Sequence, residues 1–316
     1  MKTPKTTLVS LTGGLGNQLF QLAAGLSVTG ERPLTLEWGI GKPRTGFDGL
    51  PDLCAFRLPR NVSLQPARKI NWLASKATGF MLRMAIAPTV VERVPGFFFI
   101  SRILASIVTS VYFRRPLKFL ASRNVGYASL GHSAFAKFLV GYFQSYKYMH
   151  DNSVSSILQG LRINVECEEL IQYKNLALVE LPLVVHIRLG DYKNEDNFGV
   201  LPEEYYNIAI RNLWESKQYK KIWIFSDEPE LARILFSNIL PGEARWIPEI
   251  DNSAGKTLEV MRHGNGYVIG NSTFSWWGAY LSYTKEAKII APNPWFKNLP
   301  TPHLLIPTNW ETISPW

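Results

Sequence analysis

The feature that most constrains this chain is a run of apolar residues that leads directly into charged ones. The aliphatic segment Leu183–Val185 is followed at once by His186, Arg188 and Asp191. A continuous apolar run of this kind is typical of a buried strand in a parallel sheet. Because Gly190 allows a sharp turn, we expect the three polar side chains to gather at the carboxyl end of that strand. Open α/β sheets bind their ligands at this edge.

Arg188 is the most informative of these residues. A guanidinium at a strand end, beside a turn that exposes backbone N–H groups, is suited to bidentate binding of a phosphate or diphosphate. The alternative is structural: an ion pair between Arg188 and Asp191 pins the turn, and His186 is a satisfied core residue. The motif by itself leaves both interpretations open.

Composition narrows the class of protein. The chain has 316 residues, of which 46% are hydrophobic and 19% charged, so it can form two globular domains. Its net charge of +9 favours anionic partners. The basic residues are scattered rather than clustered with aromatic ones, which argues against a nucleic-acid partner. Cys54 and Cys167 lie far apart, which argues against a disulfide framework or a thiolate metal site.

One long apolar region, residues 96–118, approaches the length of a membrane span but contains Arg102 and has basic flanks. A buried helix followed by a strand is the simpler interpretation, and a peripheral membrane contact is the alternative. The polar first ten residues lack the pattern of a secretory signal. We therefore expect a cytoplasmic protein that can lie peripherally at a membrane.

The amino-terminal segment has the order strand, glycine loop, helix, and we expect a second strand at 32–38 followed by loops with little regular structure at 39–68. The glycine loop contains Gly14 and Gly16 but continues with Asn17 and Gln18, so the third glycine of a dinucleotide fingerprint is missing and no Walker lysine follows. This absence argues against a Rossmann oxidoreductase. The loop offers close backbone approach at a helix N-terminus and two side-chain amides, which favour an anion. A tight turn without a ligand is the alternative.

Two strand ends in the second half carry further polar groups. The strand 221–225 leads into Asp227 and Glu228, and either carboxylate can accept from a guanine edge or a ribose, or cap the next helix. The strand 267–270 leads into a helix start that provides hydroxyl and backbone donors for a diphosphate. The small polar residues there are Asn271, Ser272, Thr273 and Ser275. One more strand is expected at 288–292. Alternation of strands and helices in both halves predicts an α/β protein with two doubly wound domains and the ligand between them.

Four motifs in this order carry a resemblance to a known family. They are Gly13–Gln21, His186–Tyr192, Phe225–Asp227 and Asn271–Gly278. Together they resemble the bacterial α-1,2-fucosyltransferases of glycosyltransferase family 11. The family pattern often has a second arginine where this chain has Leu189, so a second cationic contact at that position is not expected.

The resemblance implies a GT-B fold of two Rossmann-like domains. We expect an acceptor-side domain at 1–162 with an apolar helical insertion, a GDP-fucose-binding domain at 163–296, and a tail at 297–316 that packs back on the body. It also implies that L-fucose passes with inversion from GDP-fucose to the 2-hydroxyl of a galactose-terminated oligosaccharide in cell-surface polysaccharide or O-antigen synthesis. A fucosyltransferase of another linkage or acceptor is the alternative.

The resemblance further implies that no metal cofactor is required, and the sequence contains no Asp-x-Asp motif that could hold one. The leaving diphosphate would then be stabilised by Arg188, helped by His186, Asn17 and the loop 272–275. The expected donor-binding residues are Gly14, Gly16, Asn17, His186, Arg188, Asp227, Asn271, Ser272, Thr273, Phe274 and Ser275, and the expected catalytic residues are Arg188, His186, Asp191 and Asn17. The residue that accepts the proton stays open among Asp191, Glu37 and His186.

Overall fold

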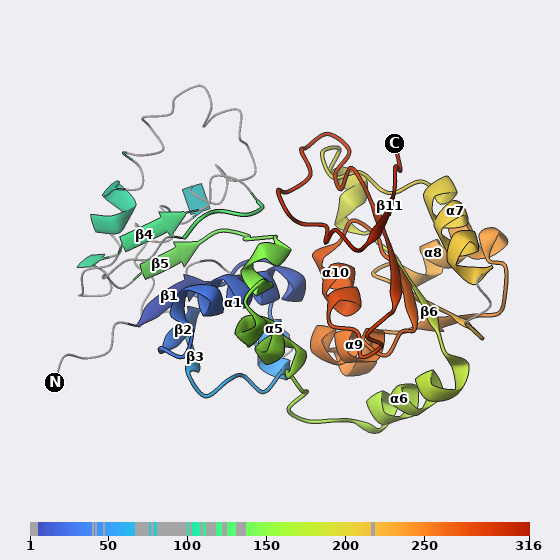
Figure 1. The fold of residues 1–316 in the computed structure, drawn as a ribbon, viewed down its shortest axis with the longest axis horizontal. Helices are drawn as coiled ribbons and strands as arrows, with labels where there is room; N and C mark the ends of the chain where they lie inside the picture. Colours follow the sequence, from blue (N-terminus) through green and yellow to red (C-terminus); the bar gives the residue numbers. More distant parts are fainter. Residues whose placement is uncertain are drawn as a thin grey trace. The chain divides into compact units, whose positions relative to one another are not determined.

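The structure is a computed structural model (Figure 1). It describes residues 6–316 apart from 40, 42, 47, 67–75, 77–78, 81–99, 101–102, 108–109, 112–117, 122–124, 131–136 and 216–218. Most of the apolar region predicted at 96–118 lies outside the described residues. The chain forms two compact units, Met1–Leu161 with Pro302–Leu305, and Arg162–Thr301 with Ile306–Trp316.

The first unit is built on a five-stranded parallel sheet in the order β3-β2-β1-β5-β4. Its strands are β1 (Thr7–Ser10), β2 (Leu34–Glu37), β3 (Val62–Gln65), β4 (Lys118–Ala121) and β5 (Lys137–Val140). Every residue of the three middle strands is buried. The helices of this unit whose bounds the structure gives are α1 (Leu15–Thr29) and α5 (Asn152–Gln159), with the 3-10 turns η1 (Asp52–Ala55) and η2 (Tyr146–Met149). The described residues 103–107 and 110–111 are also helical. Helix α1 packs on β1 and β2 because its leucines and alanines form an apolar face.

The second unit is built on a six-stranded parallel sheet in the order β11-β10-β9-β6-β7-β8. Its strands are β6 (Leu183–Ile187), β7 (Ile222–Ser226), β8 (Ala244–Ile247), β9 (Gly266–Val268), β10 (Lys288–Pro292) and β11 (Glu311–Ile313). The helices are α6 (Glu168–Glu180), α7 (Glu203–Trp214), α8 (Pro229–Phe236), α9 (Ala254–Met261) and α10 (Thr273–Tyr280), with 3-10 turns η3 (Asp191–Asn194), η4 (Ser237–Ile239) and η5 (Ile250–Asn252).

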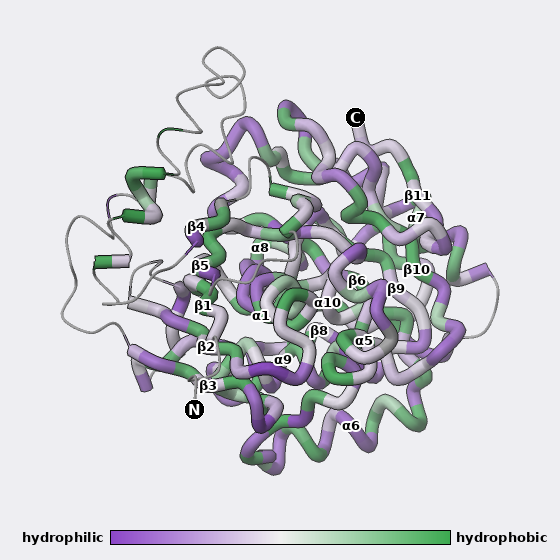
Figure 2. The backbone as a smooth tube through the Cα atoms, turned by 60° about the vertical axis from the view of Figure 1, so that its left-hand side comes forward, coloured by the Kyte–Doolittle hydropathy of each residue, from purple (hydrophilic) through white to green (hydrophobic). Residues whose placement is uncertain are grey.

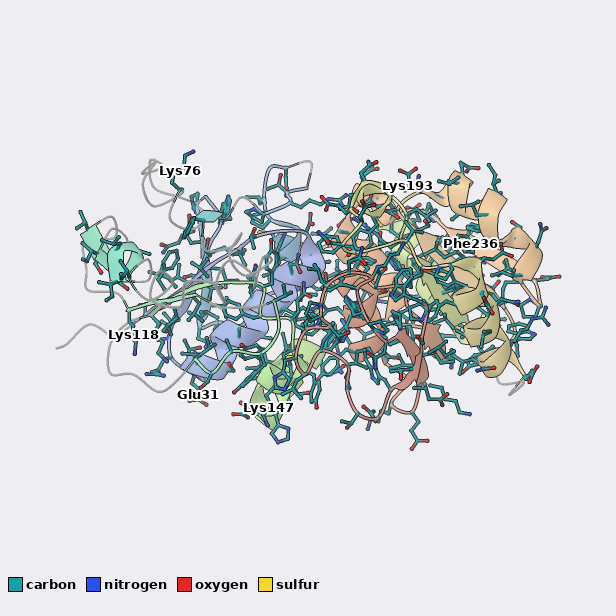
Figure 3. The ribbon with its side chains drawn as sticks, turned by 90° about the horizontal axis from the view of Figure 1, so that it is seen from above. Glu31, Lys76, Lys118, Lys147, Lys193 and Phe236 are labelled. Carbon is teal, nitrogen blue, oxygen red and sulfur yellow. The ribbon has the colours of Figure 1, made fainter. Side chains whose placement is uncertain are left out.

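Side chains from β6, β7, α7 and α8 share one apolar core in this unit. Phe236 of α8, labelled in Figure 3, packs edge-on against Tyr206 of α7 with ring centroids 5.1 Å apart. Helix α6 is less amphipathic than α7 and α8. Hydrophobic and hydrophilic segments alternate along it in Figure 2, and its apolar residues Leu178 and Val179 are exposed. The central strand β6 is fully buried, as its continuous apolar run predicts.

The strand order places a topological switch point in each unit. In the second unit the chain moves outward from β6 through β7 to β8, then returns to β9 on the other side of β6. In the first unit it moves from β1 to β3, and β5 later pairs with the other side of β1. The loops leaving β6 and β9, and those leaving β1 and β5, therefore diverge at a sheet edge that favours ligand binding.

The strands that the sequence predicts are confirmed, and the structure adds the interior strand β5 and the edge strands β3, β8 and β11. Predicted and observed strands agree for β1, β2, β6, β7, β9 and β10. The segment 39–68 was expected to be loops, and that prediction was wrong for β3. Strand β3 has few residues and lies at a sheet edge, so its side chains alternate between exposed and buried without a continuous apolar signal. Strand β11 comes from the tail and pairs in parallel with β10.

Candidate functional site

The second unit brings Arg188 and Asp227 together through strand register. Strands β6 and β7 pair in parallel with Ile187 opposite Ser226. Arg188 and Asp227 are the next residues of the two strands, so both emerge at the same carboxyl edge. The sequence predicted that polar groups would gather there, and the sheet order confirms it.

The guanidinium of Arg188 is held by two carboxylates. Its Nε and Nη2 donate to Oδ1 of Asp191 at 3.1 and 2.6 Å, and Nη1 lies 3.2 Å from Oδ2 of Asp227. The guanidinium also lies over the ring of Tyr192, 5.3 Å from its centroid. The Arg188–Asp191 ion pair of the structural interpretation is therefore present, but the Asp191 side chain is 65% exposed. Such an exposed pair is weak and can be exchanged for a stronger anion.

Asp227 ties the turn after β6 to the end of β7. Its Oδ1 accepts from the backbone N–H of Leu189 at 3.0 Å, while Oδ2 contacts Arg188. Gly190 makes this approach possible, because a Cβ added there would lie 2.2 Å from Oδ2 of Asp227. Both carboxylate oxygens thus have protein partners, so Asp227 positions Arg188. Its predicted contact with guanine or ribose stays a prediction.

His186 is a neutral, buried hydrogen-bonding group. Burial, with a smaller effect from the neighbouring charge of Arg188, lowers the pKa of His186 to about 3. Its Nδ1 is buried and has no hydrogen-bond partner among the described residues. The imidazole ring lies 5.9 Å from the ring of Phe274. A histidine in this state can donate or accept one hydrogen bond but contributes no positive charge at neutral pH.

In the loop after β9, two of the hydroxyl groups predicted to bind a diphosphate form hydrogen bonds within the loop and the start of α10. The Ser272 hydroxyl caps α10 by accepting from the N–H of Phe274 at 3.3 Å. The Ser275 hydroxyl donates to the carbonyls of Gly270 and Ser272 at 3.3 and 3.1 Å. The Thr273 hydroxyl has no hydrogen-bond partner in the part of the chain that the structure describes. Thr273 and the helix N-terminus are therefore the groups that this loop can offer to an anion.

Asn271 and Tyr192 join the loop after β6 to the loop after β9. The Asn271 amide donates to the carbonyls of Phe198 and Gly199 at 3.1 and 2.9 Å. The Tyr192 hydroxyl donates to the Asn271 carbonyl at 3.1 Å, and burial raises the pKa of Tyr192 to about 12. Tyr192 was not among the predicted site residues. Its position four residues after Arg188, which places an aromatic ring within reach of the guanidinium, was the available signal.

In the first unit the glycine loop turns at Gly13, whose φ of 71° is the left-handed region that favours glycine. Gly14 is the N-cap of α1, and Gly16 is buried in its first turn. Gln18 is fully buried: its Nε2 donates to two carbonyls and its Oε1 accepts from the N–H of Leu53 at 2.9 Å. Of the two predicted amides, Gln18 is therefore structural, whereas Asn17 is only half-buried.

The other proposed proton acceptor, Glu37, lies at the carboxyl end of β2. It is buried, and its Oε1 accepts from the N–H of Gly39 at 2.7 Å.

Among the described residues no group of three or more His, Cys, Asp or Glu side chains is arranged to hold a metal ion. No described helix is both long and apolar enough to cross a bilayer.

Two parallel, doubly wound units of this kind are the architecture of the GT-B fold. The solved fucosyltransferase NodZ from Bradyrhizobium has the same fold: it aligns with a TM-score of 0.50 at 12% identity, over 95% of this chain and all of NodZ (100%). A structure of NodZ α-1,6-fucosyltransferase soaked with GDP-fucose also aligns with a TM-score of 0.50 at 12% identity, covering 89% of this chain and 93% of that one.

The model of glycosyl transferase family 11 matches residues 104–302, and the chain belongs to that family. It is 27% identical to an α-1,2-colitosyltransferase of Escherichia coli over 299 residues, or 91% of each chain. It is also 31% identical to the O-antigen biosynthesis glycosyltransferase WbnK of Escherichia coli over 167 residues, which is 50% of this chain and 55% of WbnK. The resemblance seen in the sequence motifs is thereby confirmed at the level of the family.

Proposed function

We propose that this glycosyltransferase moves L-fucose from GDP-fucose, with inversion, to the 2-hydroxyl of a terminal β-galactoside. Membership of family 11 supports sugar transfer, and the α-1,2 linkage in the name of the colitosyltransferase supports the choice of hydroxyl. The name of WbnK supports a role in O-antigen synthesis. The soaked NodZ structure, which has the same fold, supports GDP-fucose as the donor.

The observation that carries the proposal is the position of Arg188 at the switch point of the second unit. The guanidinium is oriented by Asp227 from one side, while its other partner, Asp191, is mostly exposed. A diphosphate carries more charge than a carboxylate and offers bidentate oxygens, so it can displace Asp191 from the guanidinium. Arg188, with Thr273 at the start of α10, would then offset the charge of the departing GDP without a metal ion.

In the proposed reaction the acceptor hydroxyl forms a bond to the anomeric carbon as the bond to the GDP oxygen breaks. The bonding electrons leave with the diphosphate, and the hydroxyl proton passes to a base. His186 is a weak base, because its pKa is lowered to about 3. Asp191 and Glu37 are the other two candidates, and Asp191 loses its guanidinium partner when the diphosphate binds.

Transfer of colitose is the second candidate function. The colitosyltransferase covers 91% of this chain, and colitose lacks one ring hydroxyl of fucose. The two donors are separated by offering both GDP-sugars to the enzyme with one galactoside and comparing kcat/KM. A preference for GDP-colitose would replace fucose by colitose in the proposal and would leave the family and the linkage unchanged.

The test of the donor site is a calorimetric titration of GDP with EDTA present. Loss of one charge-assisted phosphate contact in Arg188→Ala should weaken GDP binding by about 2 kcal/mol, or roughly thirtyfold. Arg211→Ala is the matched control, since it removes the same charge from an exposed position of α7 where Arg211 contacts Asn207. Equal binding by Arg188→Ala and wild type, or binding that EDTA abolishes, would contradict the proposal.

The proposal includes a peripheral membrane contact through the described helical residues 100, 103–107 and 110–111. Five apolar side chains among them are exposed, at sequence intervals of one to four residues: Ile100, Ile103, Leu104, Ile107 and Val111. Such an exposed apolar group, on a chain with a net charge of +9, suits the interface of an anionic bilayer, where lipid-linked acceptors are presented.

Cosedimentation with vesicles rich in anionic lipid tests this membrane contact. Leu104→Glu should abolish it, whereas Ile234→Glu on the exposed face of α8 should not, although both substitutions add one charge. Equal binding of the two variants would refute the contact.

A further inference from the structure

The switch point of the first unit carries a pair of amides in direct contact. Gln144, in the loop after β5, donates from Nε2 to Oδ1 of Asn17 at 2.9 Å, although 127 positions separate the two residues in the chain. The pair joins the loops that leave β1 and β5, which are neighbouring strands. It therefore occupies, in the first unit, the place that Arg188 occupies in the second.

The loop that carries Gln144 is held in place from several sides. The backbone N–H of Gln144 donates to the carbonyl of Val125 at 2.8 Å. The preceding residue, Phe143, is buried with a φ of 53°, a left-handed conformation that costs free energy in a residue with a side chain. The following Ser145 donates from its hydroxyl to the carbonyl of Leu304 at 2.8 Å. Gln144 is itself only 6% exposed, so its side chain has little freedom to change partners.

This contact decides which end of the Asn17 amide is offered to a ligand. Because Oδ1 accepts from Gln144, Nδ2 is the remaining hydrogen-bonding group of Asn17. Nδ2 lies over the open face of Gly13, where an added Cβ would approach it to 2.4 Å. No acceptor for Nδ2 lies within hydrogen-bond distance among the described residues, and Asn17 is half-buried rather than covered.

Gln144 carries a second indication of a ligand. Its Oε1 is buried and has no hydrogen-bond partner among the described residues, which is costly for a polar atom. The contacting amides thus present an unused donor on Asn17 and an unused acceptor on Gln144. A sugar hydroxyl, which can accept one hydrogen bond and donate another, is the complementary group.

We infer that Gln144 is a positioning residue that holds Asn17 so that its Nδ2 donates to a substrate oxygen. This inference rests on the proposed function. The oxygen belongs to a sugar or sugar phosphate, of the nucleotide sugar or of the acceptor. Asn17 makes the contact, and Gln144 acts through Asn17.

The test is a double-mutant cycle on transfer kinetics, with donor and acceptor varied separately. Asn17→Ala should lower kcat/KM by about a hundredfold, the usual effect of losing one positioned donor. Gln144→Met, which keeps the length of the side chain but removes its hydrogen bonds, should lower kcat/KM by about tenfold. In the Asn17→Ala background Gln144→Met should have no further effect, because its action passes through Asn17.

Two further variants keep the test decisive. Gln144→Glu preserves the shape of the side chain, but its carboxylate can only accept a hydrogen bond from Asn17. The Asn17 amide should then turn so that its oxygen, not its Nδ2, faces the substrate. We expect kcat/KM to fall about as much as in Gln144→Met, and to show no such fall in the Asn17→Ala background. Ser145→Ala is the control for general loosening of the loop, and its effect should multiply with that of Asn17→Ala. A changed KM for the GDP-sugar assigns the oxygen to the donor, and a changed KM for the galactoside assigns it to the acceptor.

The two proposals fail in different ways. A wild type that transfers no sugar from any GDP-sugar would refute the proposed function, and this inference with it. An active wild type in which Gln144→Met is without effect, or lowers kcat/KM equally with and without Asn17, would refute the positioning role alone. Thermal unfolding of each variant shows that the protein measured is folded.

Discussion

Replacing Asp191 by asparagine tests whether the diphosphate competes for the guanidinium of Arg188. In the structure Asp191 takes Nε and Nη2 of Arg188, whereas Asp227 takes Nη1. Binding of a diphosphate at the Nε–Nη2 edge must break the first contact and can leave the second intact. Asp191→Asn removes the charge that has to be displaced and should therefore strengthen GDP binding.

The expected gain in GDP affinity can be estimated from the solvent exposure of the Arg188 and Asp191 side chains. The side chains are 23% exposed for Arg188 and 65% for Asp191, so the pair belongs with surface ion pairs, which contribute about 0.2–1 kcal/mol. GDP affinity should accordingly rise by a factor of about 1.4 to 5 at low salt. The gain should shrink as ionic strength increases, because salt screens the pair that competes with GDP.

Calorimetry with GDP and steady-state kinetics together give the result. Unchanged or weaker GDP binding by Asp191→Asn would refute the competition between carboxylate and diphosphate. The kinetics separate the two candidate bases: if Asp191 accepts the proton, kcat falls by about a hundredfold or more while GDP binds more tightly. If kcat is unchanged in Asp191→Asn, Glu37 remains as the candidate base.

Three further predictions concern the turn, the buried histidine and the helix cap. Gly190→Ala should weaken GDP binding and lower the free energy of unfolding, because the added Cβ would lie 2.2 Å from Oδ2 of Asp227. GDP titration measures the first effect and denaturant unfolding the second. Unchanged values of both would contradict the close approach. The pKa of His186, lowered by burial to about 3, lies below that of the unfolded chain, so its contribution to stability is present above about pH 6.5 and is lost as the pH falls toward 3. His186→Gln should flatten this dependence by up to about 1.4 kcal/mol per pH unit in urea unfolding, and parallel curves for the two proteins would count against it. Ser272→Ala removes the cap of α10 and should cost about 1 kcal/mol of stability, which Ser272→Gly should largely spare.

The sequence predicted the framework of the site well because strand ends are marked locally. A buried apolar run followed by charged residues places Arg188 at a carboxyl edge, and a glycine loop before a helix does the same for Asn17. In the aromatic segment 141–148, Phe143 and Tyr148 are buried and pack edge-on, with ring centroids 5.9 Å apart.

The residues that sequence reasoning missed act across long separations. Strands β3, β8 and β11 are short and carry weak periodicity, so only pairing with neighbouring strands identifies them. Gln144 had no signal of its own, because its contact with Asn17 spans 127 positions. Tyr192 was visible in the central motif, but its bond to the Asn271 carbonyl depends on the pairing of β6 with β9.

Local sequence patterns were enough to identify the central strands and their helices, the family, and the strand ends at which the polar groups stand. Tertiary structure decided which of those groups remain available to a ligand. Gln18 and Ser275 bond to nearby backbone, whereas Asn17 and Thr273 keep donors without partners among the described residues. The physical reason is that residue type fixes how many hydrogen bonds a group can form, while the packing of distant strands and loops fixes how many are already formed.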